Sequence, residues 1–195
     1  EKKYRKGVKK IWYSKKNIEI NKIIKKEDLT MKRPPNAKLA PIFIENIENF
    51  KITKKIQTEE PISKFNIKTN ITAVIVARLK SKRLPGKALK KINNETLLDH
   101  LIKRLKLSKK VNNIVLATTR NKEDQKITKI AKSNGITVFR GEEKNVLKRM
   151  FNASGKFKSN IIIRVTGDDI LIDPQYLDKL IDYHLRNNLE YSNNK

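Results

Sequence analysis

The stretch that decides the fold is residues 73–87, which read Ala73-Val74-Ile75-Val76-Ala77-Arg78-Leu79-Lys80-Ser81-Lys82-Arg83-Leu84-Pro85-Gly86-Lys87. The first five residues are apolar and do not alternate with polar ones, which is typical of a strand buried in a parallel sheet. Cationic side chains, a serine and a Pro-Gly turn follow directly. Because open α/β folds bind ligands at the carboxyl ends of their strands, this loop predicts that the carboxyl edge of the sheet binds a triphosphate.

Apolar runs alternate with segments of helical spacing after residue 70, which is typical of an α/β fold. We expect parallel strands near 72–77, 113–117, 136–139 and 161–165, and helices over about 95–107, 122–134, 144–155 and 175–186. Each helix carries an apolar face for packing. The sequence therefore predicts an incomplete Rossmann-like three-layer domain in which residues 71–77 and 161–165 are neighbours in one sheet.

The same loop contains a motif of fixed residue types, Ala77-Arg78-x-x-Ser81-x-Arg83-Leu84-Pro85-Gly86-Lys87. This motif resembles the N-terminal signature of the cytidylyltransferases that activate acidic sugars, especially the group called spore-coat polysaccharide biosynthesis proteins. The likeness covers roughly residues 71–185, with further landmarks at 114–119, 138–141, 146–149, 164–168 and 171–174. It implies a truncated nucleotide-diphospho-sugar transferase fold and transfer of CMP from CTP to an acidic sugar of the nonulosonic type, for surface polysaccharides.

The loop supplies the candidate phosphate-binding residues. Arg78 and Arg83 can each form forked hydrogen bonds to a phosphate group, whereas Lys87 acts as a point charge. A hydroxyl and backbone N–H groups can complete an anion-binding nest, and the residues concerned are Ala77, Ser81 and Gly86. The alternative interpretation is an ordinary basic turn.

Asp168 follows the apolar run 161–165, so it lies at the same carboxyl edge as the loop if the strands are parallel. A carboxylate there can hold Mg²⁺, which prefers one or two carboxylates together with phosphate oxygens and water. The resemblance makes Asp168 the first metal-binding aspartate, and it makes Arg78, Lys87 and Asp168 the catalytic residues. It places the second metal-binding carboxylate and most sugar-binding residues further along the chain.

Other polar residues near the expected strand ends have two interpretations each. Thr118 follows an apolar strand, where it either contacts the base or ribose or only satisfies the strand end. Arg140 resembles a residue of the family's loop beside the nucleotide. Asp173 and Pro174 favour a helix N-cap and first turn over a binding role, and His100 and His184 match no motif.

The first seventy residues contain an internal repeat. Segments beginning at Lys16 and Lys54, which are 38 positions apart, match at apolar positions 18/56, 24/62 and 29/67. Each copy predicts a strand, a tight turn near Asn21 or Glu59 and a second short strand. The region resembles the SAF, or antifreeze-like, domain that closes sialic acid synthases, a small β-clip fold. By that resemblance Arg33 contacts the acylamino-sugar substrate in a partner subunit's barrel; a surface Arg-Pro turn is the alternative.

The charge and composition constrain the class of protein. The net charge is +26, with 46 Lys and Arg against 20 Asp and Glu. Residues 1–70 carry 19 basic and 8 acidic groups, and residues 71–195 carry 27 basic and 12 acidic groups. The excess of positive charge is therefore spread over both parts of the chain. Aromatic residues for stacking on bases are few and scattered, so we do not expect a nucleic-acid partner to account for the charge. The absence of cysteine agrees with a reducing cytoplasm, and no apolar run predicts a signal peptide or membrane span.

These patterns lead to one domain hypothesis. We expect an SAF domain over residues 1–67, with 1–7 as an upstream linker, a linker at 68–70 and the N-terminal part of a cytidylyltransferase domain at 71–195. The chain then is a fragment of a fusion between a nonulosonic acid synthase and the enzyme that activates its product, homodimeric in the full-length parent. A noncatalytic nucleotide-binding module and a basic nucleic-acid-binding protein are the alternatives.

Overall fold

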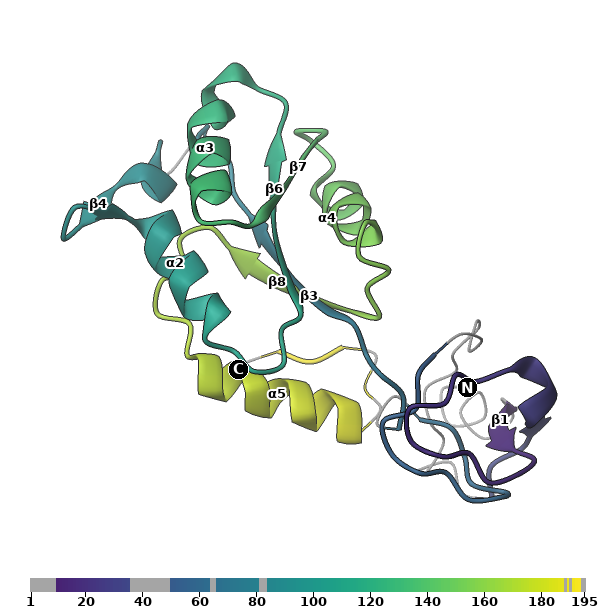
Figure 1. Cartoon of the computed structure of the whole chain (residues 1–195). Coiled ribbons are helices and arrows are strands. Elements are labelled where there is room, and N and C mark those ends of the chain that lie inside the picture. Colours follow the sequence, from purple (N-terminus) through teal and green to yellow (C-terminus); the bar gives the residue numbers. More distant parts are fainter. Residues whose placement is uncertain are drawn as a thin grey trace. The chain divides into compact units, whose positions relative to one another are not determined.

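The computed structural model describes residues 10–35, 50–63, 66–80, 84–187, 189 and 191–193. These residues fall into two compact units, one drawn from residues 1–69 and 180–195 and the other from residues 70–179. Figure 1 shows the elements of each. Within the described ranges, every helix is too short or too polar to cross a membrane.

The first unit is β-rich. Strand β1 (Ile11–Ser14) pairs antiparallel with β2 (Leu29–Lys32), and the 3-10 helix η1 (Lys26–Asp28) leads into β2. Isolated bridges hold the rest of the unit together, joining Tyr13 to Pro61, Ile18 to Ile56, Ile23 to Lys51 and Ile52 to Ile67. The small β-rich fold predicted for this region is confirmed.

Backbone hydrogen bonds repeat between the two halves of this unit. Ile18 and Ile56, which are 38 positions apart, exchange N–H···O bonds of 2.9 and 3.0 Å. The Ile24 N–H donates a 2.9 Å hydrogen bond to the Phe50 carbonyl. The equivalent bond, with each position exchanged for its counterpart 38 residues away, runs from the Ile62 N–H to the Trp12 carbonyl at 2.8 Å. The halves are therefore related by an approximate two-fold axis that passes between Ile18 and Ile56.

Each half also turns at a residue in the left-handed conformation. Asn21 has a φ of 69° and Glu59, its counterpart, a φ of 66°. Asparagine adopts this conformation readily, whereas a long side chain does so at a cost of roughly 1–2 kcal/mol. The tight turns predicted near Asn21 and Glu59 are confirmed.

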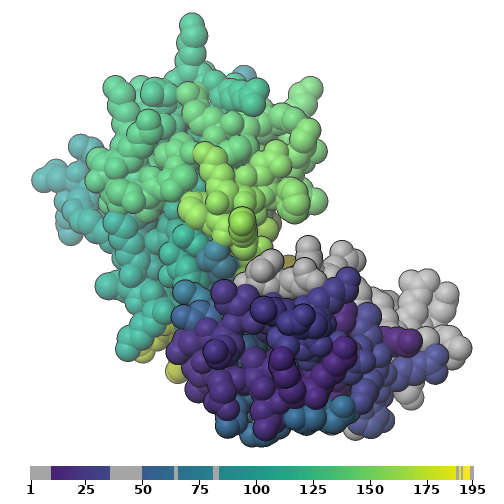
Figure 2. Space-filling model, turned by 45° about the vertical axis from the view of Figure 1, so that its right-hand side comes forward, coloured from purple at the N-terminus to yellow at the C-terminus, as the bar shows by residue number. Residues whose placement is uncertain are grey.

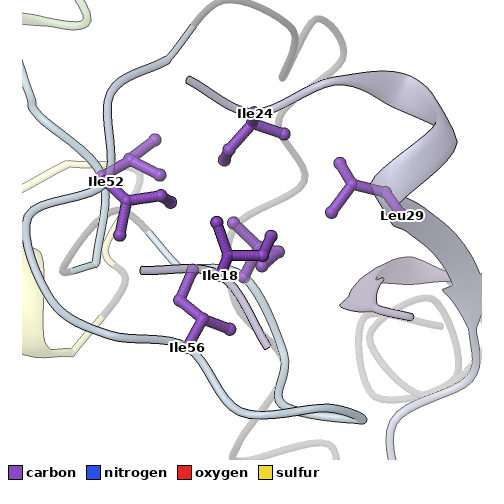
Figure 3. Close-up of a cluster of buried hydrophobic side chains, with 7 residues drawn as sticks. Ile18, Ile24, Leu29, Ile52 and Ile56 are labelled. Atoms are coloured by element: carbon purple, nitrogen blue, oxygen red, sulfur yellow. The ribbon is translucent and has the colours of Figure 1, made fainter. Parts of the chain in front are cut away.

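Apolar side chains from both halves meet at the centre of the unit. Figure 3 shows Ile18, Ile24, Leu29, Ile52 and Ile56 pointing toward one another. Ile62 and Ile67 complete the buried cluster, and Trp12 and Phe50 pack against it. All three apolar pairs of the sequence repeat thus contribute to one shared core.

The second unit is built on a parallel four-stranded sheet. Its strands are β3 (Ile71–Val76), β6 (Asn113–Thr119), β7 (Thr137–Gly141) and β8 (Ile161–Thr166). The spatial order is β7-β6-β3-β8, and every neighbouring pair is parallel. The expected adjacency of residues 71–77 and 161–165 is confirmed, because Ile71 pairs with Ile161 and Val76 with Thr166.

Helices cover both faces of this sheet. In Figure 1, α2 (Leu97–Lys106) and α3 (Gln125–Ser133) lie on one face and α4 (Val146–Gly155) on the other. Met150 and Ala153 of α4 pack on Val74, Val115 and Ala117 of the sheet. The helix α5 (Pro174–Arg186) begins where the Asp173 carboxylate accepts a 2.8 Å hydrogen bond from the Tyr176 N–H, so Asp173 is the expected N-cap.

A short hairpin precedes α2 and was not predicted from the sequence. Strands β4 (Lys91–Ile92) and β5 (Glu95–Thr96) are joined by Asn93 and Asn94, whose φ angles of 49° and 65° are typical of a tight hairpin turn. The helix expected from residue 95 begins instead at Leu97. Thr96 caps it, because its hydroxyl accepts a hydrogen bond from the Asp99 N–H.

Candidate functional site

A cavity of about 430 Å³ lies at the carboxyl edge of the sheet in the second unit. The ends of β3 and β8, the 3-10 helix η3 (Lys87–Leu89) and the helix α4 surround it. Its lining residues are Val76, Ala77, Arg78, Lys87, Ala88, Val146, Arg149, Thr166, Gly167 and Asp168. Three of the four charged lining residues are cations, so the cavity favours an anionic ligand.

The cavity brings together Lys87 and Asp168, which are 81 residues apart in the sequence. The Lys87 ammonium lies 2.5 Å from the Asp168 carboxylate, and both side chains are partly exposed, at 27% and 38%. The hydrogen bond from Lys87 lowers the pKa of the Asp168 carboxyl below its usual value, although partial burial acts in the opposite sense. Asp168 is therefore ionised at neutral pH and available to a cation.

Gly167 allows β3 and β8 to end close together. A Cβ atom at this position would lie 2.5 Å from the Ala77 Cβ, which is far inside the contact distance of two carbon atoms. The Gly167 N–H donates a 3.0 Å hydrogen bond to the Val76 carbonyl. This close approach places Asp168 beside the start of the basic loop.

Arg78 is held at the rim of the cavity by Glu143. Its Nη1 lies 3.3 Å from the Glu143 Oε1, and the other carboxylate oxygen accepts a 3.0 Å hydrogen bond from the Asn121 side chain. Arg78 keeps 45% of its side chain exposed. The guanidinium is thus oriented by one contact and still open to a ligand.

Both described ends of the basic loop are fixed. The Leu79 N–H donates a 2.7 Å hydrogen bond to the carboxylate of Asp124, which is 1% exposed. The Gly86 N–H donates to the Leu79 carbonyl at 2.9 Å, and Gly86 adopts a left-handed φ of 64°. Ser81 and Arg83, which the sequence assigns to phosphate binding, lie outside the described residues.

Arg149 belongs to the site but was not among the predicted site residues. It projects from α4 on the face that packs against the sheet and is 2% exposed. Burial, followed by repulsion from Arg78, lowers the pKa of its guanidinium. Two signals were available: its place in the landmark at 146–149, and its spacing from Val146, Met150 and Ala153, which places position 149 on the buried face of the helix.

Gly86, Thr118 and Arg140 were predicted to bind the nucleotide but are not among the cavity-lining residues. Thr118 is fully buried on β6, and no described residue forms a hydrogen bond with its hydroxyl. The Arg140 guanidinium donates to the Thr119 and Asn121 carbonyls and to the Gln125 side chain. Arg33 is exposed in the first unit. Nucleotide contacts by Thr118 and Arg140 stay predictions, and the structure gives Arg140 a visible role in bracing the end of β6.

The donor set at the cavity fits Mg²⁺ only in part. Asp168 is the single carboxylate among the described lining residues. In the described part of the chain, three or more acidic, His or Cys side chains nowhere form a metal-binding group. One carboxylate suits an ion that takes its other ligands from phosphate and water.

The loop after β8 is open to solvent. Leu171 is 83% exposed. Figure 2 shows the surface of the second unit, coloured from teal to yellow-green, from one side. Asp168 and Asp169 at the start of this loop are also exposed. A ligand can therefore reach Asp168 without a rearrangement of the second unit.

Comparisons with known proteins match both parts of the chain. A family model described as Cytidylyltransferase matches residues 72–195, and a model described as SAF domain matches residues 11–67. A solved structure of a cytidylyltransferase from Leptospira borgpetersenii serovar Hardjo-bovis has a TM-score of 0.59 and 39% sequence identity. That comparison covers 62% of this chain and 50% of the solved chain.

Three curated relatives match the same region. An uncharacterized protein, MJ1063, of Methanocaldococcus jannaschii is 44% identical over 64% of this chain and 51% of its own length. The spore coat polysaccharide biosynthesis protein SpsF of Bacillus subtilis is 36% identical, over 63% and 53%. A 3-deoxy-manno-octulosonate cytidylyltransferase of Pelobacter propionicus is 32% identical, over 57% and 43%. The chain spans about half the length of these relatives, and by its family match it belongs to the cytidylyltransferase family, with an SAF domain ahead of that family's domain.

Proposed function

We propose that this chain is part of an enzyme that transfers CMP from CTP to an acidic sugar of the nonulosonic type. The observation that carries the proposal is the Lys87–Asp168 ion pair beside Arg78 on a cavity at the carboxyl edge of the sheet. A cation and a carboxylate in contact suit a ligand that brings both phosphate groups and a metal ion. The relatives named for an acidic sugar and for surface polysaccharide support the substrate class.

The reaction that we propose is attack of a sugar hydroxyl on the α-phosphorus of CTP, with pyrophosphate as the leaving group. Such transfers depend on positioning and on neutralising the charge of the phosphate oxygens. Arg78 and Lys87 bind these oxygens, and the backbone turn at Gly86 lets the triphosphate come close. Asp168 would hold Mg²⁺, which supplies further neutralisation when it is bound. We place the sugar-binding residues and a second carboxylate ligand outside this chain.

The domain organisation extends the proposal to the first unit. We propose an SAF domain at residues 1–67, a linker at 68–70 and cytidylyltransferase sequence at 71–195, fused to a nonulosonic acid synthase. The synthase and the activating enzyme would then act one after the other in the cytoplasm, and the full-length parent would be a homodimer. Arg33 is exposed, as a residue that reaches into a partner subunit's active site must be.

Titration calorimetry with CTP and Mg²⁺ tests the site. Lys87→Ala and Arg78→Ala should each weaken CTP binding by about 1.5–3 kcal/mol, the range for a hydrogen bond to a charged group. Lys91→Ala is the matched control, since Lys91 is exposed on β4 and does not line the cavity. Equal affinity in the wild type and in Lys87→Ala would place the phosphates elsewhere.

A noncatalytic nucleotide-binding role is the second candidate, because a single described carboxylate lines the cavity. Pyrophosphate release from CTP and a 2-keto-3-deoxy acid sugar separates the two. We expect turnover in the full-length parent, loss of it in Asp168→Asn, and slow or no turnover in the 195-residue chain. A parent that binds CTP but releases no pyrophosphate with any acid sugar would favour the noncatalytic role.

A further inference from the structure

Arg149 is a buried cation that lines the cavity. Only 2% of its surface is exposed, yet the residue contributes to the lining beside Arg78. Arginine is rarely this buried unless a carboxylate or another anion pairs with it. The hydrogen-bond partners of its guanidinium therefore indicate whether the charge has a structural or a ligand-binding role.

The guanidinium bonds only to backbone carbonyls among the described residues. Nε donates to the Ala117 carbonyl at 3.3 Å, and Nη1 donates to the carbonyls of Glu142 and Glu143. No described residue accepts a hydrogen bond from Nη2, and no described carboxylate lies within ion-pair distance. Two of the three nitrogens thus fix the group in place, and the third is free for a ligand.

Carbonyl contacts do not neutralise a full charge. Asp124 and Glu143 attract Arg149 from a distance, but Arg78 repels it. A neutral side chain could bind the same carbonyls without the large cost of burying a charge. The positive charge is therefore not explained by the hydrogen bonds that tie α4 to the sheet.

The aliphatic part of the Arg149 side chain is held in place as well as its guanidinium. A Cβ atom on Gly141 would lie 3.1 Å from the Arg149 Cγ and 2.8 Å from the Phe139 ring, so β7 and the side chain are in tight contact. A guanidinium fixed on both sides loses little freedom when it binds an anion, which is how pre-organised sites gain affinity.

We propose that Arg149 is an anion-binding residue of the cavity, whose Nη2 donates to a phosphate group of the bound nucleotide. The identity of that nucleotide rests on the proposed function, but the need for an anion does not. Arg149 then acts from the floor of the cavity, while Arg78 and Lys87 act from its rim.

The test is calorimetry on the 195-residue chain with two probes, Mg·CTP and inorganic pyrophosphate. Arg149→Gln should weaken both at least about 10-fold, and Arg149→Lys should recover part of the loss because it restores the charge. Lys148→Gln is the control, since Lys148 is the next residue of α4, pairs with Glu142 and does not line the cavity. It should change either affinity by less than about twofold, because exposed charges are screened.

A structural effect is separated from a binding effect by thermal unfolding without ligand. If Arg149→Gln fails to fold, Gly141→Ala replaces it, because that change keeps the charge and displaces the aliphatic part of the Arg149 side chain. Binding within twofold of the wild type in a folded variant overturns the proposal. If Lys87→Ala abolishes CTP binding while Arg149→Gln leaves it intact, the proposed function stands and this inference fails. If pyrophosphate binds through Arg149 but CTP binds no better than pyrophosphate, the inference stands and the proposed function fails.

Discussion

Gly167→Ala tests whether the close approach of β3 and β8 builds the site. The added Cβ would lie 2.5 Å from the Ala77 Cβ, and Ala77 is itself buried. Carbon atoms in contact prefer about 3.5–4.0 Å, so the two strand ends must separate by about 1 Å. That movement lengthens the hydrogen bond between the Gly167 N–H and the Val76 carbonyl, now 3.0 Å.

The expected cost is about 2–4 kcal/mol of unfolding free energy. Overpacking contributes about 1–3 kcal/mol, and the weakened hydrogen bond contributes about 0.5–1.5 kcal/mol. Asp168 is the next residue, so a shift of this size also draws its carboxylate away from Lys87, 2.5 Å distant. We therefore expect weaker Mg·CTP binding together with lower stability.

Urea unfolding followed by circular dichroism at 222 nm measures the loss, because α2, α3 and α4 lie in the second unit. The single tryptophan, Trp12, lies in the first unit and gives a separate fluorescence signal. Gly155→Ala is the control, since no atom lies within 4 Å of its added Cβ.

The double variant Ala77→Gly with Gly167→Ala makes the reasoning refutable. Removing the Ala77 Cβ removes the atom that clashes, so the double variant should recover most of the stability and binding lost in Gly167→Ala. If the double variant is no better than Gly167→Ala alone, the contact between these two residues is not the cause.

Three further outcomes follow from buried groups elsewhere. Asp124→Ala should cost about 2–4 kcal/mol in urea unfolding, since it leaves the Leu79 N–H and the Thr119 hydroxyl without their acceptor; an unchanged midpoint would contradict this. Ile18→Ala and Ile56→Ala should each cost about 2–5 kcal/mol and agree within about 1 kcal/mol, because they are equivalent core positions; Trp12 fluorescence reports it. Burial raises the pKa of the Asp99 carboxyl, but the hydrogen bonds from Thr96 and Asn134 together outweigh it, so the pKa is lowered. Its contribution is present above the unfolded-state pKa and is lost as pH falls through the folded-state value, so the stability advantage of wild type over Asp99→Asn should shrink below about pH 4.

The sequence predicted the framework of the second unit because each strand contains a short run of apolar residues between polar segments. Residues 73–77 and 161–165 are more apolar than the segments around them, so both were predicted as strands. Lys87 and Asp168 follow these strands and were therefore both assigned to the carboxyl edge of the sheet. Parallel pairing then brought them into contact. The hairpin at 91–96 was missed because strands of two residues carry no periodicity, although Asn93 and Asn94 gave the turn signal.

The supporting residues of the site could not be predicted for a different reason. Asp124 stands at the start of a helix, where acidic residues usually cap, but its carboxylate bonds to Leu79, 45 residues earlier. Arg149 is a charged residue in a chain with many exposed lysines, so its residue type predicted a solvent-exposed position, whereas its spacing on the helix predicted a buried one. Such contacts depend on the packing of distant elements, which local patterns do not encode.

The approximate two-fold axis of the first unit has a consequence for how that unit folds. Neither half can bury Ile18 or Ile56 alone, because each packs against the other across the axis. Folding must therefore close a loop of about 38 residues before either half gains its core. A peptide of one half would be unfolded as a monomer and could fold only by pairing with a second copy of itself, which is also the simplest ancestor from which a duplicated chain could arise.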